Sequence, residues 1–276
     1  MSHAPAELII EAGHTERNYW RDLFRYRELF YFLAWRDVLV RYKQTVIGIL
    51  WAVLRPLLTM VVFTFVFSRI AKLPSDGVPY PVMVFAAMLP WQLFATSLTE
   101  GSGSLINNSN LISKVYFPRL IVPASSVIVS FVDFAISMVL LFVIMAIYQV
   151  FPGVPMLMLP VFTVVALLAS AGAGIWLAAL NVKYRDFRYV VPFIVQFGLY
   201  VSPVGFSSGI VPEKWRLLYS LNPMVGVIDG FRWSVSNGRT PFPSQSLTFS
   251  LATIFFLLFT GIWYFRKTER TFADVI

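Results

Sequence analysis

The side chains that could carry chemistry in this chain are few and lie far apart. The chain has no cysteine, which excludes disulfides, thiolate metal sites and cysteine nucleophiles. Both histidines, His3 and His14, lie in the polar N-terminal segment, so a histidine metal site within a membrane is excluded as well. Two ionisable residues interrupt otherwise apolar stretches: Arg55, which precedes Pro56, and Asp133. The sequence therefore predicts no catalytic residue and no metal site.

Each of these two ionisable residues has a functional and a structural interpretation. Asp133 could act as a proton relay or make a polar contact within a helix bundle. Arg55 lies about 15 Å into its apolar stretch at 1.5 Å per residue, where facing lipid is costly. We expect it to face a pore, to reach back toward the membrane surface, or to pair with Asp133 or helix carbonyls. Pro56 weakens the backbone hydrogen-bond ladder there and allows a kink.

The elements that position these residues are apolar helices. Of the 276 residues, 58% are hydrophobic and only 13% are charged, and the mean hydropathy is +0.71. Soluble domains are about 45–50% apolar, and a spanning helix needs about 20 apolar residues. The sequence predicts an all-α polytopic membrane protein with six spans, at about 46–68, 77–99, 120–149, 154–180, 189–212 and 240–265.

The distribution of basic residues predicts the orientation of the spans. An even number of spans places both termini on one side of the membrane. With that side inside, 15 of the 22 Lys and Arg residues fall in cytoplasmic segments and six in outer segments. Cytoplasmic loops of membrane proteins are rich in Lys and Arg, so we expect both termini in the cytoplasm. The same rule explains the net charge of +8 better than nucleic-acid binding does, and no cleavable signal peptide is expected.

Residues 28–43 predict an amphipathic helix that lies along the membrane surface before the first span. An ordinary soluble helix of the N-terminal tail is the alternative. Asp37 and Arg41 are four residues apart and can pair on the polar side. The apolar side consists of Tyr31, Trp35, Val38, Leu39 and Tyr42.

The segment 211–239, between the fifth and sixth spans, predicts a helical hairpin. Residues 213–220 and 224–236 are two helix-like pieces that are too short to span a membrane. Asn222 followed by Pro223 is a good helix start, because Asn caps and Pro is tolerated at the first helical position. We expect a re-entrant or interfacial hairpin on the outer face, with Asn222, Pro223, Asp229 and Arg232 as its polar and turn-forming residues.

The predicted fourth span contains the small residues ASAGAG at 169–174. Ser170 and Gly174 are four residues apart, as are Ala169 and Ala173. Small residues at this spacing let two helices approach closely. We expect this stretch to serve packing within or between subunits.

Several motifs together resemble one family. RYKQTVIGILWA at 41–52, followed by Pro56, resembles the first span of type-2 ABC exporter permeases, most closely the branch that exports O-antigen and related polysaccharides. The resemblance continues in NLISKVYFPRLIVP at 110–123, NVKYRDFR at 181–188, SPV at 202–204, LNPM at 221–224 and FR at 231–232. The motifs appear in family order over about residues 28–266.

The resemblance implies a half-transporter. Two copies would form the pore in a bacterial inner membrane, and two copies of a separate ATPase would bind ATP and Mg, in agreement with the lack of a G-x-x-x-x-G-K-[ST] pattern here. It divides the chain into a tail (1–27), the interfacial helix (28–43), the six-span domain (44–266) and a C-terminal tail (267–276). No cofactor is expected in this chain.

The cytoplasmic stretch 108–117 would be the coupling helix that receives the ATPase stroke. Lys114 and Arg119 would face the partner or lipid phosphate, although plain membrane anchoring also explains them. Arg185 and Asp186 would make a second contact or pair with each other. The coupling residues that the resemblance implies are Asn110, Ser113, Lys114, Tyr116, Arg119, Arg185 and Asp186.

The substrate that the resemblance implies is a polysaccharide on an undecaprenyl-pyrophosphate lipid. Sugar rings stack on aromatic rings, so an aromatic path would let a polymer slide, although Trp and Phe in spans more often serve packing or the interfacial belt. Arg55 would be a partner for the pyrophosphate. The substrate-path candidates are Trp51, Arg55, Phe63, Phe67, Trp91, Phe94, Tyr200 and Phe206.

Other functions remain as alternatives. Export of capsular polysaccharide or teichoic acid belongs to the same family. A membrane-embedded glycan acyltransferase would need a His or a carboxylate cluster at a membrane face, and the sequence has neither. A proton-coupled carrier usually has internal repeats and several intramembrane acids, whereas Asp133 is isolated.

Overall fold

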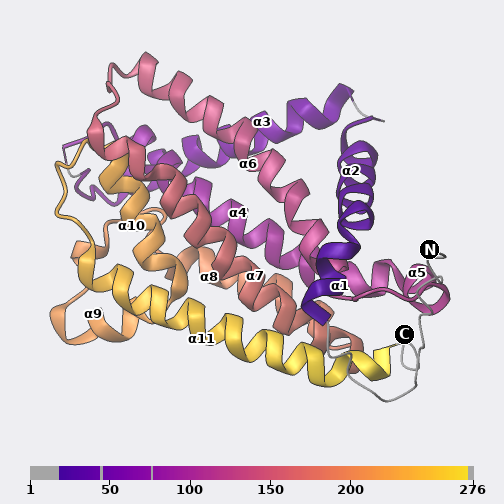
Figure 1. Ribbon diagram of the computed structural model, residues 1–276. Helices are drawn as coiled ribbons and strands as arrows, with labels where there is room; N and C mark the ends of the chain where they lie inside the picture. The colour runs from indigo at the N-terminus through magenta and orange to yellow at the C-terminus, as the bar shows by residue number, and fades with distance from the viewer. Residues whose placement is uncertain (1–18, 44–45, 76, 273–276) are drawn as a thin grey trace, which may run out of the picture.

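The computed structural model describes residues 19–43, 46–75 and 77–272. Every regular element within these residues is helical, which confirms the all-α prediction (Figure 1). The two histidines and the start of the predicted N-terminal tail lie outside the described residues. The α-helices are α1 (Tyr19–Arg25), α2 (Arg27–Lys43), α3 (Val46–Phe63), α4 (Tyr80–Asn107), α5 (Ser109–Lys114), α6 (Ile121–Ile147), α7 (Leu159–Lys183), α8 (Phe187–Val201), α9 (Glu213–Ser220), α10 (Pro223–Val235) and α11 (Ser244–Thr268). A π-helix, η1 (Thr64–Ile70), and three 3₁₀ helices, η2 (Val154–Met158), η3 (Ser208–Ile210) and η4 (Glu269–Thr271), complete the list.

Five of these segments are long and apolar enough to cross a membrane. They are Leu50–Ile70, Tyr80–Asn107, Ile121–Ile147, Val154–Lys183 and Ser244–Thr271. The predicted span at 189–212 instead forms α8, which has 15 residues and ends at Val201. At 1.5 Å per residue α8 measures about 22 Å, less than the hydrocarbon core of about 30 Å. Length and composition therefore support five candidate spans, and the sixth crossing stays a prediction.

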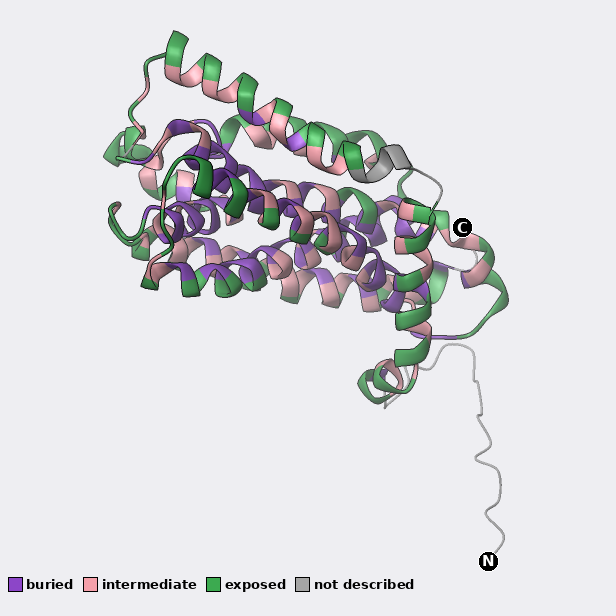
Figure 2. Cartoon of the chain, turned by 90° about the horizontal axis from the view of Figure 1, so that it is seen from above, coloured by how far each residue is buried: buried purple, intermediate pink, exposed green. Residues whose placement is uncertain are grey.

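The bundle is built around α4. In α4, 83% of the apolar stretch is buried within the chain, compared with 11% in the span formed by α3 and η1. Its neighbours are α6, α7, α10, α8 and α3. Seen from above, the middle of the bundle is buried, whereas α3, along the upper edge of the view, is mostly exposed or intermediate (Figure 2). One apolar helix thus serves as the core, and another presents its apolar surface outward.

Small residues bring α7 and α11 into close contact, but the contact is made by Gly172 and not by the predicted four-residue pairs, whose Gly174 lies against Ser97 of α4. Ala169 and Ser170 are fully buried. A Cβ on Gly172 would lie 2.9 Å from the backbone nitrogen of Leu258, and one on Gly261 would lie 2.7 Å from the Gly172 carbonyl oxygen. Any larger residue at either glycine would push the two helices apart. The predicted packing role of this stretch is confirmed within the chain.

The predicted helix at 28–43 is present as α2 and stands across the direction of the long helices (Figure 1). Leu33 and Ala34 are buried against the bundle. Tyr31 and Trp35 are exposed, with their rings stacked at 6.4 Å between centroids. The aromatic side of α2 thus faces away from the bundle, and its position at a membrane surface stays a prediction.

The long helices give the molecule two ends. At one end the Tyr19 hydroxyl donates to a carboxylate oxygen of Glu269 at 3.3 Å, so the beginning and the end of the described chain meet there. We call this the terminal end, and it also carries α5 (Figure 1). Helices α9 and α10 lie toward the opposite end, which we call the hairpin end. The meeting of the described chain ends fits an even number of crossings.

Candidate transport path and its two ends

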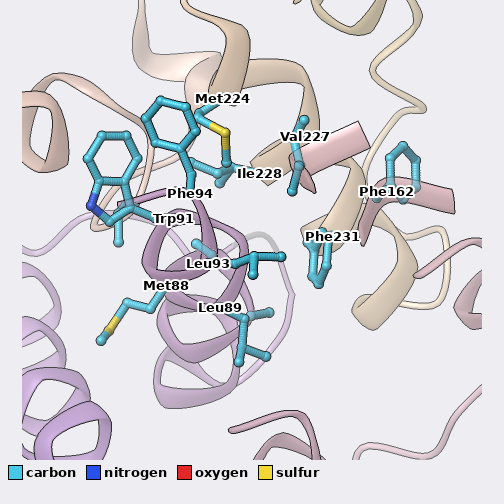
Figure 3. Packing of buried hydrophobic residues seen from close by; sticks show 14 of the residues in the cluster. Met88, Leu89, Trp91, Leu93, Phe94, Phe162, Met224, Val227, Ile228 and Phe231 are labelled. Carbon is cyan, nitrogen blue, oxygen red and sulfur yellow. The ribbon is translucent and has the colours of Figure 1, made fainter. Parts of the chain in front are cut away.

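At the hairpin end, α10 is an integral part of the core. Asn222 starts the helix as expected: its side-chain oxygen accepts from the Met224 N–H at 3.0 Å, and Pro223 occupies the first turn. The apolar side of α10 faces α4 and α7, and the ring of Phe231 lies 6.2 Å from that of Phe134 on α6 (Figure 3). The buried α10 residues labelled in Figure 3 are Met224, Val227, Ile228 and Phe231. The short helix is therefore held from several sides.

The chain that follows α8 is irregular, and buried side chains satisfy its carbonyl groups. Arg232, which is 5% exposed, donates to the carbonyl oxygens of Phe206 and, at 3.1 Å, Val204. The Tyr80 hydroxyl donates to the Gly205 carbonyl at 2.5 Å. Unsatisfied buried carbonyls are costly, so these donors permit a non-helical segment inside the protein. The SPV and FR motifs meet here, a contact that their separation in sequence conceals.

The aromatic candidates divide into two groups. Trp91 and Phe94 are 5% and 7% exposed and pack inside the bundle. Phe63 and Phe67 also pack against this core, with their rings edge to face at 5.5 Å. A path lined by these four side chains would require the bundle to open. Two of them pack against glycines: a Cβ on Gly198 would lie 2.6 Å from the Trp91 ring, and one on Gly205 would lie closer still to the Phe67 ring.

The second group is exposed. Trp51 on α3 and Tyr200 on α8 lie at the surface, and Phe206 is half-buried. Three further aromatic residues on α8 are exposed together with Tyr200 and were not predicted. They are Tyr189, Phe193 and Phe197. All four are exposed on α8 at spacings of four, four and three residues, and the Phe193 and Phe197 rings stack at 5.8 Å. We call these four residues the α8 aromatic ladder. Helical spacing of aromatics in 189–200 was the signal that could have found it.

Arg55 does not pair with Asp133, so that alternative is wrong. Asp133 instead accepts from the Tyr42 hydroxyl and lies 3.4 Å from the Arg41 guanidinium, which also lies 3.8 Å from Glu100. The contact ties α2 to α6. Burial, followed by the hydrogen bond and charge of Asp133, raises the pKa of Tyr42, so its phenol stays a donor. Asp133 is therefore a structural contact in this conformation.

The expected pair of Asp37 with Arg41 is also wrong. Asp37 pairs with its neighbour Arg36 at 2.7 Å, and Arg36 donates to the Asn108 side chain at 2.9 Å. The helix turns Arg41 toward α6, so it faces Asp133. Arg55 itself is exposed on α3, and among the described residues its side chain has no hydrogen bond or ion pair.

At the terminal end, α5 occupies the stretch expected to be the coupling helix. Ile112 is buried and holds α5 on the bundle. Arg185 and Asp186, in the turn between α7 and α8, are exposed and form no ion pair with each other in the described structure. The other expected coupling residues that are exposed are Asn110, Ser113, Lys114 and Tyr116.

Arg119 does not face outward, which corrects the expectation. Its backbone N–H donates to the Glu269 carboxylate at 2.9 Å, and its guanidinium donates to the Glu269 carbonyl. Tyr19 donates to the same carboxylate, and the Arg266 guanidinium lies 4.7 Å from the Tyr19 ring centroid. Burial, followed by the charge of Glu269, raises the pKa of Tyr19, which therefore stays protonated. We call Tyr19, Arg119, Arg266 and Glu269 the terminal clamp.

Comparison with known proteins agrees with this architecture. A family model described as ABC-2 type transporter matches residues 28–235. The chain is 29% identical over 259 residues to the O-antigen export system permease protein RfbA of Myxococcus xanthus, covering 93% of this chain and 98% of that protein. It is 27% identical over 242 residues to the protein of the same name from Klebsiella pneumoniae, covering 87% and 92%. It is 20% identical over 238 residues to the polysialic acid transport protein KpsM of Escherichia coli, covering 85% and 91%. Because the family model spans most of a chain with five membrane-length apolar helices, the chain belongs to the ABC-2 type transporter family and is a multi-pass membrane permease.

Proposed function

We propose that this permease is the membrane subunit of an ATP-driven exporter that moves a lipid-linked polysaccharide of the O-antigen type across the bacterial inner membrane. Two copies form the path, and two copies of a separate ATPase, which bind ATP and Mg, supply the energy. The names of the relatives support the substrate class, because two O-antigen export permeases align with nearly their whole length. The lack of a P-loop supports the separate ATPase.

The observation that carries the proposal is the exposed side of α3 and α8. Arg55 lies on the exposed side of α3, near Trp51 and Leu58 at helical spacing. Arg55 lies near the start of the Leu50–Ile70 span, where a cation is costly against lipid unless it reaches the membrane surface; we propose that this side faces a second copy or a water-filled path. The α8 aromatic ladder gives such a path flat apolar surfaces for sugar rings. Arg55 is then placed to meet the pyrophosphate of the lipid carrier.

The proposed topology has six crossings with both termini in the cytoplasm. The sixth consists of α8 and the irregular segment after it, whose carbonyls Arg232 and Tyr80 satisfy. Helices α9 and α10 then form the re-entrant hairpin on the outer face, and α2 lies along the inner surface. The positive-inside distribution of Lys and Arg places the terminal end, with the exposed α5, against the ATPase.

Capsular polysaccharide export is the second candidate. The similarity to a polysialic acid transport protein favours it, at the lower identity of 20%. Teichoic acid export has no comparable support. The ATPase partner distinguishes these functions, because any domain that recognises a specific glycan would have to be on that subunit.

Purification of the tagged protein from its native membranes in mild detergent tests whether it is a subunit of an ATP-driven exporter. We expect a P-loop ATPase in equal amount, identified by mass spectrometry. If the protein purifies alone under conditions in which other ABC exporters stay intact, the proposed function is wrong.

Paired substitutions test the path. Phe193→Ala with Phe197→Ala should slow export about five- to thirty-fold, because two aromatic contacts contribute about 1–2 kcal/mol in total. Phe255→Ala with Phe259→Ala, at exposed positions of α11, is the matched control and should leave export unchanged. Export is measured as glycan that reaches the cell surface per unit time. Equal effects of the two pairs would contradict a path along α8.

A further inference from the structure

A cavity of about 460 Å³ lies at the hairpin end, where α9, α10 and the start of α11 meet. This volume is within the range of small-molecule sites, about 300–1,000 Å³. Ser207, Ser208 and Gly209, which follow the irregular segment after α8, form part of its wall. The chain that continues from α8 thus contributes to the cavity at the hairpin end.

The cavity wall combines both charges with hydroxyls and two aromatic rings. Two cations and one anion make a poor site for a metal ion, and they are an equally poor lining for an alkyl chain. Donors and acceptors side by side suit a polyhydroxylated ligand, since each sugar hydroxyl both donates and accepts. The wall residues that matter here are Arg216, Tyr219, Asp229, Arg232, Phe242 and Ser246.

Tyr219 is part of the cavity wall, and its hydroxyl lies buried within that wall. Its hydroxyl is buried and has no hydrogen-bond partner among the residues that the structure describes. Burial, followed by the charge of Asp229, raises the pKa of Tyr219, although Arg232 opposes this, so the phenol stays neutral at physiological pH. Native proteins rarely leave a buried hydroxyl unpaired, and each such group calls for an explanation.

The remaining wall groups are held in place by the fold. Arg232 is anchored by its bonds to the Val204 and Phe206 carbonyls, which makes it a positioning residue. Ser246 lies 3.5 Å from an Asp229 carboxylate oxygen, a long contact. Phe242 packs edge to face on Trp233 at 5.0 Å between ring centroids. The cavity thus has a preformed wall.

We propose that this cavity binds one or two sugar residues of the glycan as it leaves the transport path. The inference rests on the proposed function. It adds a site in each copy, separate from the path along α3 and α8, at which Asp229 accepts from a sugar hydroxyl and Tyr219 donates to another once its side chain turns the buried hydroxyl into the cavity. Occupation of this site would hold the polymer between ATPase strokes.

Photo-crosslinking in cells tests the proposal with the complete exporter and the cell's own glycan. A benzophenone amino acid replaces Phe242 at the cavity, Phe197 on the α8 aromatic ladder, or Phe259 on the exposed side of α11. Glycan adducts are labelled by periodate oxidation and biotin hydrazide. We expect adducts at positions 242 and 197 and none at 259.

Two substitutions then ask whether the adduct depends on the cavity wall. Tyr219→Phe and Asp229→Asn should each lower the adduct at 242 about three- to ten-fold, the effect of one hydrogen bond, and leave the adduct at 197 unchanged. Thr248→Ala removes a hydroxyl that bonds only within α11 and is the matched control. Tyr219→Phe should not lower the thermal unfolding midpoint, because the hydroxyl it removes has no partner.

The outcomes separate the two proposals. Adducts at 197 but not at 242 would overturn the cavity as a glycan site and leave the exporter intact. Adducts at 242 that do not respond to Tyr219→Phe or Asp229→Asn would also overturn it, since the glycan would then pass without binding there. If neither position is labelled and no ATPase purifies with the protein, it is the proposed function that has failed.

Discussion

At both ends of the molecule, charged side chains hydrogen-bond to backbone groups, but the surroundings of these bonds differ. At the terminal end, Glu269 joins Tyr19 and Arg119, so that segments from the beginning, middle and end of the chain converge on one residue. At the hairpin end, Arg232 satisfies the carbonyls after α8, but beside it lies a cavity of about 460 Å³. Both ends bury charge against backbone, and at the hairpin end a cavity lies beside the buried cation.

This difference agrees with the two tasks that an exporter must perform. An end whose segments are joined by hydrogen bonds transmits displacement better than one whose segments are separate. A hollow end can hold a ligand and can change shape at low cost. Under the proposed function, the terminal clamp would carry the movement of the ATPase from α5 to α11, whereas the hairpin end would respond to the glycan.

The largest effect is expected at Arg232. Arg232→Met leaves the buried carbonyls of Val204 and Phe206 without donors and should lower the free energy of unfolding by about 2–5 kcal/mol. Arg239→Met is the matched control, since Arg239 donates to the Gly77 carbonyl at an exposed position, and it should cost less than about 1 kcal/mol. Thermal unfolding in detergent measures both. Equal losses would mean that Arg232 does not support the irregular segment.

The next effect concerns the terminal clamp. Glu269→Ala removes the acceptor for Tyr19 and for the Arg119 N–H, and should destabilise this end by about 1–3 kcal/mol. Glu269→Gln keeps an acceptor oxygen and should cost less. We expect the proposed exporter assembled with the alanine variant to keep the ATP hydrolysis of its ATPase subunit but to export less, and the variant chain to show faster proteolysis near α1. Unchanged coupling of hydrolysis to export would exclude the clamp from the transmission of force.

A smaller effect is expected at Asp133. Asp133→Asn keeps an acceptor for Tyr42 and loses the partly exposed ion pair with Arg41, at a cost of about 1 kcal/mol or less. Export should continue at more than about half the normal rate. A proton relay predicts the opposite, namely complete loss of transport. Export measured at two external pH values decides between them.

The smallest effect is expected at Glu100. Its distance to the Arg41 guanidinium is 3.8 Å and both side chains are substantially exposed, so Glu100→Gln should change stability by less than about 0.5 kcal/mol. A larger change than that of Asp133→Asn would show that Arg41 depends on Glu100 more than on Asp133. The two variants are compared in the same unfolding experiment.

Much of the helical layout was predictable because its signals are local. The uncharged runs predicted the long helices, and Asn222 with Pro223 predicted the start of α10, since a cap depends on neighbouring residues. The helix at 28–43 and the small-residue contact in α7 were predicted for the same reason. The predicted span at 189–212 agrees less well with the structure. Its composition does not reveal that the helix α8 ends at Val201 and that an irregular segment follows.

The sequence by itself determined the class of molecule: an all-helical, apolar, P-loop-free permease with motifs in family order. Only the tertiary structure decided which charged side chains pair with each other and which aromatic side chains are exposed. It turned Arg41 to Asp133 and Arg119 to Glu269, buried Trp91, and exposed Phe193 and Phe197. The physical reason is that hydropathy is a property of each residue, whereas burial and pairing depend on which helices meet. In a chain this apolar, hydrophobicity alone cannot tell the core from the surface that faces a partner or the path.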